Sequence, residues 1–210
     1  MFLICCFYVL CNLPHTIITP CFISNSWFIL FQNEVTLLGD SNLRRLATAQ
    51  LGRRASTYTS VSSNRRRVFV ELAIGGQTIG QLRKRVLRSL RQGEEYRYQL
   101  GREVIVLIGG NDIRRNAKIR SIRVGMHRLL QDLKRCKIRV NLCTYPTIKL
   151  PPLQQDVAVQ FNEFLRSVAN KNVHIRLIDI AVVVGDQEQY FEEDGIHLNM
   201  AGLTLFNSLL

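Results

Sequence analysis

Short runs of β-branched residues alternate with amphipathic stretches from residue 35 to the end of the chain, and this alternation limits the possible folds more than any other feature. Repeated strand–helix units are typical of α/β proteins, in which right-handed helical crossovers join parallel strands. The chain has 210 residues, 47% of them hydrophobic, so it can bury one sizeable core. We therefore predict an α/β protein built as a three-layer α/β/α sandwich around a five-stranded parallel sheet.

Five segments have the composition of strands, and the sequence between them has the spacing of helices. The predicted strands are residues 35–38, 68–74, 104–108, 138–143 and 173–178. Three apolar stripes predict helices: Ile79, Leu82, Val86 and Leu90; Ile122, Met126, Leu129 and Leu133; and Val157, Phe161, Phe164 and Val168. Residues 200–210 form a further helix-like run, whereas residues 60–67 and 145–152 read as loops.

Residues 1–33 differ from the remainder because they contain no Lys, Arg, Asp or Glu. This apolar leader lacks the positively charged start of a secretory signal, and its first apolar run is too short to span a bilayer. Three interpretations stay open: a signal peptide, a membrane anchor, or a mispredicted leader ahead of one domain at residues 34–210. The missing charged flank slightly favours an intracellular protein, while secretion or membrane contact requires a genuine leader.

Cysteine and histidine spacing gives no sign of a metal site. Four of the six cysteines lie in the leader, which leaves Cys136 and Cys143 in the remainder and provides no disulfide framework. No Cys-x-x-Cys pair or His-rich tract is present in the sequence. We therefore predict no metal and no other cofactor.

Three polar patches lie where predicted strands end or predicted helices begin. They are Gly39-Asp40-Ser41, Gly109-Gly110-Asn111-Asp112 and Asp194-Gly195-Ile196-His197. The carboxyl ends of parallel strands meet at one edge of a sheet, which is where α/β proteins bind their ligands. We therefore expect these patches to share one site with Gly75-Gly76, which follows the second predicted strand.

The residue types in these patches suit acyl transfer. Ser41, at a strand-to-helix turn, supplies a hydroxyl nucleophile and its own backbone N–H. His197 can accept the serine proton near neutral pH, and Asp194 can fix its tautomer. Gly76 and Asn111 can donate hydrogen bonds to an oxyanion. Taken singly, each patch also fits a plain turn, a helix-capping Asp or an Asx-turn, so their combination carries the prediction of a hydrolytic site.

Four motifs resemble, in order along the chain, the four blocks of the SGNH (GDSL-type) hydrolase superfamily. They are Leu38-Gly39-Asp40-Ser41, Ile74-Gly75-Gly76-Gln77-Thr78, Gly109-Gly110-Asn111-Asp112 and Asp194-Gly195-Ile196-His197-Leu198. The resemblance covers about residues 35–210. It implies a flavodoxin-like sandwich and a carboxylic-ester hydrolase that acts on a small acyl ester. It also implies a catalytic triad of Ser41, Asp194 and His197, and an oxyanion hole made by Ser41, Gly76 and Asn111.

Two residues depart from the usual pattern of this superfamily. Asn42 stands in place of the Leu that commonly follows the serine, and Gly75 stands in place of a frequent Ser. Because both positions lie beside the expected site, we expect them to bear on substrate preference more than on chemistry.

The charge of the chain favours a second interpretation. The formal net charge is +12, and all of it belongs to residues 34–210. The candidate nucleic-acid-binding residues are Arg65, Arg66 and Arg67; Arg83, Lys84, Arg85 and Arg88; and Arg114 and Arg115. Each cluster alone also fits a solvated helix face. Together they predict binding of a polyanion at low salt.

Some members of the same superfamily are associated with nucleic acids. SGNH-like domains occur in reading frames of non-LTR retroelements, and the OSK domain of the insect germ-plasm protein Oskar is an RNA-binding version that is understood to lack the triad. By this resemblance, the alternative is an RNA- or DNA-binding domain with little or no hydrolase activity. We rank the hydrolase first because four ordered motifs are more specific than charge alone.

Overall fold

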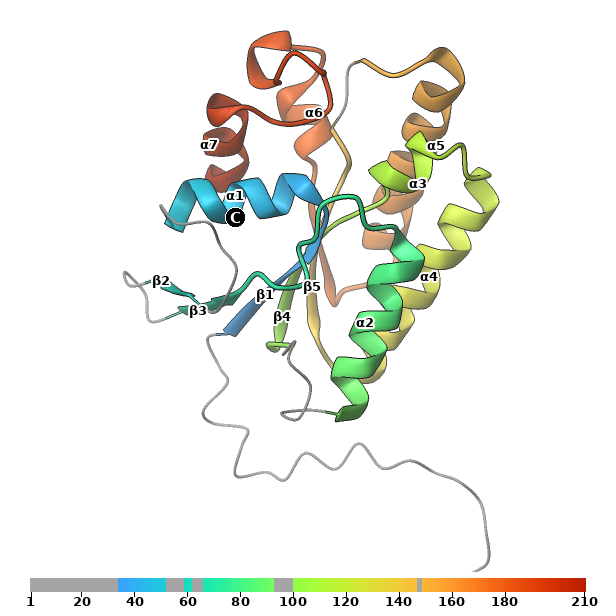
Figure 1. Ribbon diagram of the computed structural model, residues 1–210. Coiled ribbons are helices and arrows are strands. Elements are labelled where there is room, and N and C mark those ends of the chain that lie inside the picture. The colour runs from blue at the N-terminus through green and yellow to red at the C-terminus, as the bar shows by residue number, and fades with distance from the viewer. Residues whose placement is uncertain (1–33, 52–58, 62–65, 93–99, 147–148) are drawn as a thin grey trace, which may run out of the picture.

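The structure, a computed structural model, describes residues 34–51, 59–61, 66–92, 100–146 and 149–210 (Figure 1). The apolar leader and Arg65 lie outside the described residues, as do the side chains of Arg66 and Arg67. The described chain forms a central sheet between two layers of helices. The predicted three-layer α/β/α sandwich is confirmed.

The sheet has six strands in the order β2-β3-β1-β4-β5-β6. The strands that run parallel to one another are β3 (Arg66–Phe69), β1 (Glu34–Gly39), β4 (Glu103–Leu107), β5 (Arg139–Cys143) and β6 (Ile175–Ile178). Of these, β1, β4, β5 and β6 fall on the segments that the sequence predicts as strands, whereas β3 shares only Val68 and Phe69 with the predicted strand 68–74 and begins in the predicted loop 60–67. The order, with the first strand near the middle and later strands added outward on one side, places the carboxyl ends of β1 and β4 next to each other.

Two details of the sheet differ from the prediction. β2 (Thr59–Val61) pairs antiparallel with β3 at the edge, in a region that the sequence suggests is partly a loop. Three residues are too few to display the alternation that marks a strand. β3 ends at Phe69 because the chain turns at Val70, and Ala73 alone returns to bridge Gly39.

Two apolar clusters fill the space on either side of the sheet. α2 (Ile79–Gln92), α4 (Ile119–Arg135) and α5 (Pro152–Asn170) cover one face, and α1 (Ser41–Leu51), α6 (Ile180–Val184) and α7 (Met200–Ser208) cover the other (Figure 1). Side chains alternate along β4 accordingly: Val104 and Val106 join the first cluster, and Ile105 and Leu107 join the second.

The three apolar stripes of the sequence correspond to α2, α4 and α5. Their central residues, such as Leu82, Met126 and Phe161, are fully buried. The short helices α3 (Gly110–Arg114) and η3 (Glu188–Tyr190), like α6, were not predicted, because one turn or so of helix cannot show a repeating apolar spacing.

A buried glutamine joins the loops at the carboxyl edge of the sheet. The Gln77 side chain is 2% exposed, and its Nε2 donates to the backbone O of Gly39 and to that of Leu72, the latter at 2.6 Å. The Ile74 N–H also donates to Gly39 O, at 3.0 Å. These bonds hold the turn after β3 against the end of β1, directly before Ser41.

Candidate active site

Three side chains that are far apart in the sequence form one hydrogen-bonded chain at the carboxyl edge of the sheet. Ser41, the first residue of α1, has its Oγ 2.7 Å from Nε2 of His197. Nδ1 of His197 lies 2.5 Å from Oδ2 of Asp194. With both ring nitrogens engaged in this way, a serine proton can pass to the imidazole while a carboxylate holds the ring in the required tautomer.

The Asp194 carboxylate is held in its ionised form. Its Oδ1 accepts hydrogen bonds from the backbone N–H groups of Ile196 and His197, each at 2.9 Å. Partial burial raises the pKa of Asp194, but the hydrogen bonds from His197 and Ile196 outweigh it and lower the pKa to about 2. A carboxylate that is ionised across the neutral range can stabilise the imidazolium formed when His197 takes a proton.

His197 sits on a loop of residues 191–198, between η3 and α7, that closes on itself. Phe191 and Leu198 form a β-bridge, and the Glu192 N–H donates to His197 O at 2.8 Å. Gly195 has φ 62°, and a Cβ there would lie only 2.5 Å from a neighbouring side chain. Glycine is therefore required for the tight bend that sets Asp194 beside the imidazole.

Asn42 joins this loop to α1. Its Oδ1 accepts from the Leu198 N–H at 3.0 Å, and its Nδ2 donates to Ile196 O at 3.2 Å. These two peptide groups flank His197 directly. The Asn42 side chain is fully buried, so it does not face a substrate, contrary to the expectation drawn from its place next to Ser41.

The turn that carries Gly75 and Gly76 lies beside Ser41. A Cβ on Gly75 would be 3.9 Å from Cβ of Ser41, and Gly76 adopts φ 76° with open space around it. Asn111 is 5% exposed, and its Nδ2 donates to the backbone O of Gln77 at 3.0 Å. A carboxamide nitrogen carries two hydrogens, so one remains for a substrate oxygen. The structure thus brings the predicted oxyanion residues onto adjoining loops.

Two glycines let Asn111 come so close to the sheet. Gly109 has φ 122°, and a Cβ there would lie 2.5 Å from the ring of Phe161. A Cβ on Gly110 would lie 2.0 Å from the Tyr145 ring and hydroxyl. A side chain at either position would push α3, and Asn111 with it, away from the site.

Two consecutive arginines of α3 and its C-cap contact the same loops. Arg114 Nη2 donates to Asn111 Oδ1 at 2.5 Å, which fixes the carboxamide with its nitrogen toward Gln77. Arg115 Nη2 donates to Gly76 O at 3.2 Å. Both arginines, which the sequence suggests for nucleic-acid binding, therefore have partners within the candidate site.

The arginine cluster of α2 is divided between the interior and the surface. Arg83 pairs with the buried Asp132 at 2.7 Å, and Arg85 donates to Oε1 of Gln77 at 2.7 Å. Lys84 and Arg88, by contrast, are exposed. The exposed pair is thus available to a partner, while Arg83 and Arg85 support the fold.

A buried acid lies behind Ser41. The Asp40 side chain is inaccessible to solvent, and its Oδ1 accepts from the Asn42 N–H at 3.0 Å, which caps the start of α1. Burial raises the pKa of Asp40 to about 6, although this hydrogen bond, the Tyr145 hydroxyl and the Arg114 guanidinium all favour the ionised form. Burial likewise raises the pKa of Tyr145 well above its ordinary value.

Within the described residues, no group of three or more His, Cys, Asp or Glu side chains could hold a metal ion. Among the helices of that same part of the chain, none combines the length and the apolarity that a bilayer crossing needs.

Cys143 is buried, and burial raises the pKa of its thiol, so we assign it to packing.

One family model spans most of the chain. The model of the GDSL-like lipase/acylhydrolase family matches residues 37–205, which include all four motifs. The chain belongs to the GDSL-like lipase/acylhydrolase family. A search of the curated proteins gives no match to the sequence.

Solved structures of GDSL proteins share this fold. The lipase/acylhydrolase from Enterococcus faecalis is 19% identical with a TM-score of 0.63, over 85% of this chain and 93% of that one. A lipolytic G-D-S-L family protein from Veillonella parvula is 17% identical with a TM-score of 0.64, over 84% and 94%. The C-terminal domain of Drosophila Oskar is 21% identical with a TM-score of 0.63, over 82% and 84%. At these identities the likeness concerns the fold.

Within this GDSL-like domain, sequence reasoning did not identify three residues that support the site. Gln77 and Asn42 each bond to backbone groups on other segments, and Arg114 orients Asn111. Asn42 and Gln77 had a signal, because each is a polar residue directly beside a GDSL-type motif residue. Arg114 had none, because its place in a run of basic residues resembles a solvated helix face.

Proposed function

We propose that this protein is a serine carboxylic-ester hydrolase that forms an acyl intermediate on Ser41. The observation that carries the proposal is the chain of contacts from Ser41 through His197 to Asp194, with separations of 2.7 Å and 2.5 Å. Membership of the GDSL-like lipase/acylhydrolase family supports hydrolysis as the class of reaction. The substrate that we propose is a small acyl ester.

The proposed reaction has two halves that use the same base. Ser41 Oγ attacks the ester carbonyl while its proton moves to Nε2 of His197. The tetrahedral intermediate then expels the alcohol, which takes the proton from the imidazolium. Water attacks the acyl-enzyme while its proton moves to His197, and the second tetrahedral intermediate then releases the acid as Ser41 Oγ takes that proton back from the imidazolium. Asp194 stays ionised throughout and stabilises the charged ring.

We assign the developing oxyanion to three donors: the backbone N–H groups of Ser41 and Gly76, and Nδ2 of Asn111. These donors lie at the start of α1, in the turn after β3 and in α3, three segments that are joined by hydrogen bonds of Gln77, Arg114 and Arg115. Donors fixed before the reaction need no reorganisation when negative charge develops, which is why such a hole lowers the barrier.

Labelling with a fluorophosphonate probe tests the proposal without the natural substrate, because the probe reacts only with an activated serine. We expect the wild-type protein to be labelled at Ser41 and to hydrolyse short p-nitrophenyl esters. Ser41→Ala should lose both activities. Ser121→Ala, which removes an exposed serine from α4, is the matched control and should keep both. Absence of label on wild-type Ser41 would rule the hydrolase out.

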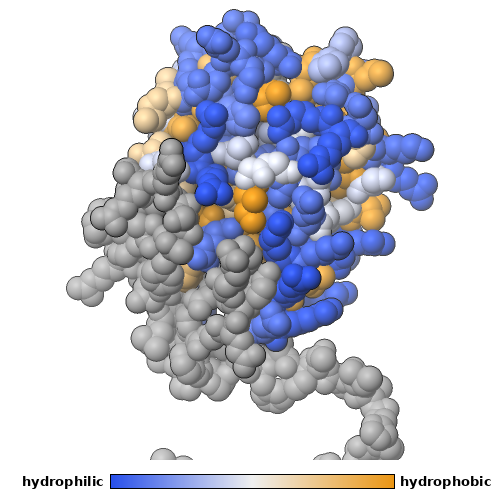
Figure 2. Space-filling model, in the orientation of Figure 1, coloured by the Kyte–Doolittle hydropathy of each residue, from blue (hydrophilic) through white to orange (hydrophobic). Residues whose placement is uncertain are grey.

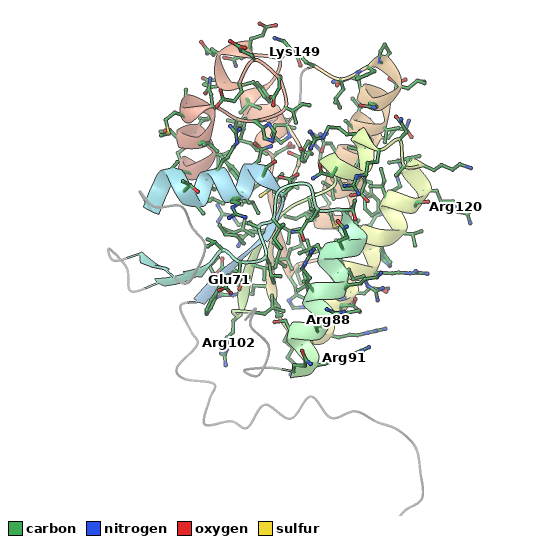
Figure 3. The ribbon with its side chains drawn as sticks, in the orientation of Figure 1. Glu71, Arg88, Arg91, Arg102, Arg120 and Lys149 are labelled. Atoms are coloured by element: carbon green, nitrogen blue, oxygen red, sulfur yellow. The ribbon has the colours of Figure 1, made fainter. Side chains whose placement is uncertain are left out.

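A second candidate function is binding of RNA or DNA, and the surface over α2 and α4 favours it. Hydrophilic residues cover most of this side of the molecule (Figure 2), where Arg88 and Arg91 project from α2 and Arg120 from α4 (Figure 3). The sequences of the two helices contain a single acidic residue, the buried Asp132. A face with exposed cations and almost no acid attracts the phosphate backbone of a nucleic acid.

A salt titration of oligonucleotide binding tests this second function. The double variant Lys84→Gln/Arg88→Gln should weaken binding and reduce the dependence of log K on log salt by up to about 2, because about one counterion is released per phosphate contact. The control Arg44→Gln/Lys171→Gln removes the same charge from exposed positions on α1 and at the end of α5. No binding at about 50 mM salt by the wild-type protein would exclude the function.

A further inference from the structure

We propose that Asn42 is a positioning residue that docks the His197 loop onto α1 and so sets the distance between nucleophile and base. The inference rests on the proposed hydrolase function and concerns how that site is assembled. The geometry that carries it is a pair of hydrogen bonds from one carboxamide to the two peptide groups on either side of His197.

The two contacts use both ends of the amide group, its oxygen as an acceptor and its nitrogen as a donor. Oδ1 of Asn42 accepts from the Leu198 N–H at 3.0 Å, and Nδ2 donates to Ile196 O at 3.2 Å. Asn42 and Leu198 are both fully buried, so water cannot replace the bond between them, whereas the bond to Ile196 O is partly buried. A leucine at position 42, which is usual in the superfamily, can make neither of them.

Asn42 is itself held firmly next to the nucleophile. It is the second residue of α1, directly after Ser41, and its N–H donates to the Asp40 carboxylate at 3.0 Å. One turn of helix therefore carries both the reacting hydroxyl and the group that grips the histidine loop. A shift of α1 therefore moves Ser41 and the Asn42 hydrogen bonds to the His197 loop together, which preserves the 2.7 Å contact between Ser41 Oγ and His197 Nε2.

Packing of Phe191 and Leu198 in the apolar cluster beneath α1 anchors the two ends of the loop, and most of its other hydrogen bonds shape it internally, so Asn42 is the buried polar contact that places the residues on either side of His197. The bridge between Phe191 and Leu198 and the bond from the Glu192 N–H to His197 O both join residues within the loop. Glu192 also pairs with Arg45 of α1 at 3.1 Å, but this ion pair is exposed, and exposed pairs stabilise weakly. Loss of Asn42 should therefore leave the loop folded and displace it relative to Ser41.

Displacement of a base by about 1 Å can reduce turnover about 100-fold without changing ground-state binding. For Asn42→Leu we expect kcat for a p-nitrophenyl ester, and the rate of fluorophosphonate labelling, to fall by about 10- to 100-fold. KM should stay within about twofold, because the buried side chain touches no substrate. A change in KM alone would instead assign Asn42 to substrate preference and overturn the proposal.

Asn141→Leu is the control for a general loss of stability. Asn141 is also a buried asparagine, in β5, and its Nδ2 donates to Glu103 Oε1 at 2.7 Å, away from the carboxyl ends of the strands. This variant should unfold more easily but be labelled at the wild-type rate while folded. If the two variants lose labelling only in proportion to their loss of folded protein, Asn42 has no positioning role.

Asn42→Asp provides a reading that does not depend on tolerance of leucine. A protonated aspartic acid has the shape of asparagine and can both donate to Ile196 O and accept from the Leu198 N–H, whereas the carboxylate can only accept. The labelling rate of Asn42→Asp relative to wild type should therefore rise as pH falls from about 8 to about 5.5. A pH-independent ratio would contradict the proposal, while an unlabelled wild-type protein would instead contradict the hydrolase function on which it rests.

Discussion

Two groups of residues flank Ser41, the proposed triad on one side and the proposed oxyanion donors on the other, and different kinds of side chain support each group. On the side of the proposed triad, the neutral carboxamide of Asn42 joins α1 to the His197 loop through one buried and one partly buried hydrogen bond. On the oxyanion side, the charged side chains of Arg114 and Arg115 contact Asn111 and Gly76. A neutral support suits the base, because a cation beside His197 would oppose its protonation. Cationic supports suit the oxyanion donors, because a cation behind Asn111 favours the negative charge of an oxyanion.

The basic residues fall into two pairs with different surroundings. Arg114 and Arg115 belong to the candidate site, while Lys84 and Arg88 lie exposed on α2. Charge removal at the first pair should reduce hydrolysis, and charge removal at the second should affect only polyanion binding. The two proposed functions can therefore be separated by variants of the same residue type.

Removal of the proposed base, His197, should have the largest effect on kcat. Without an imidazole beside Ser41, the hydroxyl keeps its proton, so we expect His197→Ala to lower kcat by about 10⁴- to 10⁶-fold. His127→Ala, which removes an exposed histidine from α4, should leave kcat unchanged. Steady-state hydrolysis of p-nitrophenyl acetate measures both, and a His197→Ala enzyme within tenfold of wild type would show that another group is the base.

Removal of the proposed side-chain oxyanion donor, Asn111, should cause a smaller loss of kcat. Removal of one donor typically costs about 3 to 4 kcal/mol of transition-state stabilisation, so we expect Asn111→Ala to lower kcat by about 100- to 1000-fold. KM should change little, because the donor acts mainly on the tetrahedral state. Asn170→Ala, at the exposed end of α5, is the control. An effect on KM alone would place Asn111 in ground-state binding.

Arg114, which donates a hydrogen bond to Asn111, should contribute less to kcat than Asn111 itself. The Arg114 guanidinium orients the Asn111 carboxamide from a distance of 2.5 Å, and a hydrogen bond to a charged group contributes about 1.5 to 3 kcal/mol. Since only part of this reaches the transition state, we expect Arg114→Met to lower kcat about tenfold. In a double variant with Asn111→Ala the Arg114→Met effect should vanish, because the residue acts through Asn111. Additive losses would mean that Arg114 contacts the substrate.

Short motifs in the sequence predict the groups of the proposed site, because Ser41, Asn111 and the Asp194–His197 pair are each recognisable from their immediate neighbours. Their supports were not predictable in the same way. Asn42 bonds to a residue 154 positions away, and nothing local indicates that Arg114 points inward rather than to solvent. Both facts depend on tertiary packing, which brings loops together only after the sheet has formed. The layers of the fold were predictable because burial imposes its spacing on every strand and helix.

The smallest expected effect on rate concerns Asp40, a buried residue behind Ser41 that influences stability instead. Burial raises its pKa to about 6 from an ordinary value of 3.8, so the folded state holds this proton more tightly than the unfolded state does. The stability that protonated Asp40 contributes is therefore fully present below about pH 4 and is lost as pH rises through about 6, up to about 3 kcal/mol in total. Asn at position 40 keeps an acceptor for the Asn42 N–H but never ionises. Urea unfolding should therefore show Asp40→Asn to be more stable than wild type near pH 8, with a difference that shrinks toward pH 4. A difference that is constant with pH would show that folding leaves the pKa of Asp40 unchanged, so that its hydrogen bonds and the Arg114 guanidinium offset the effect of burial.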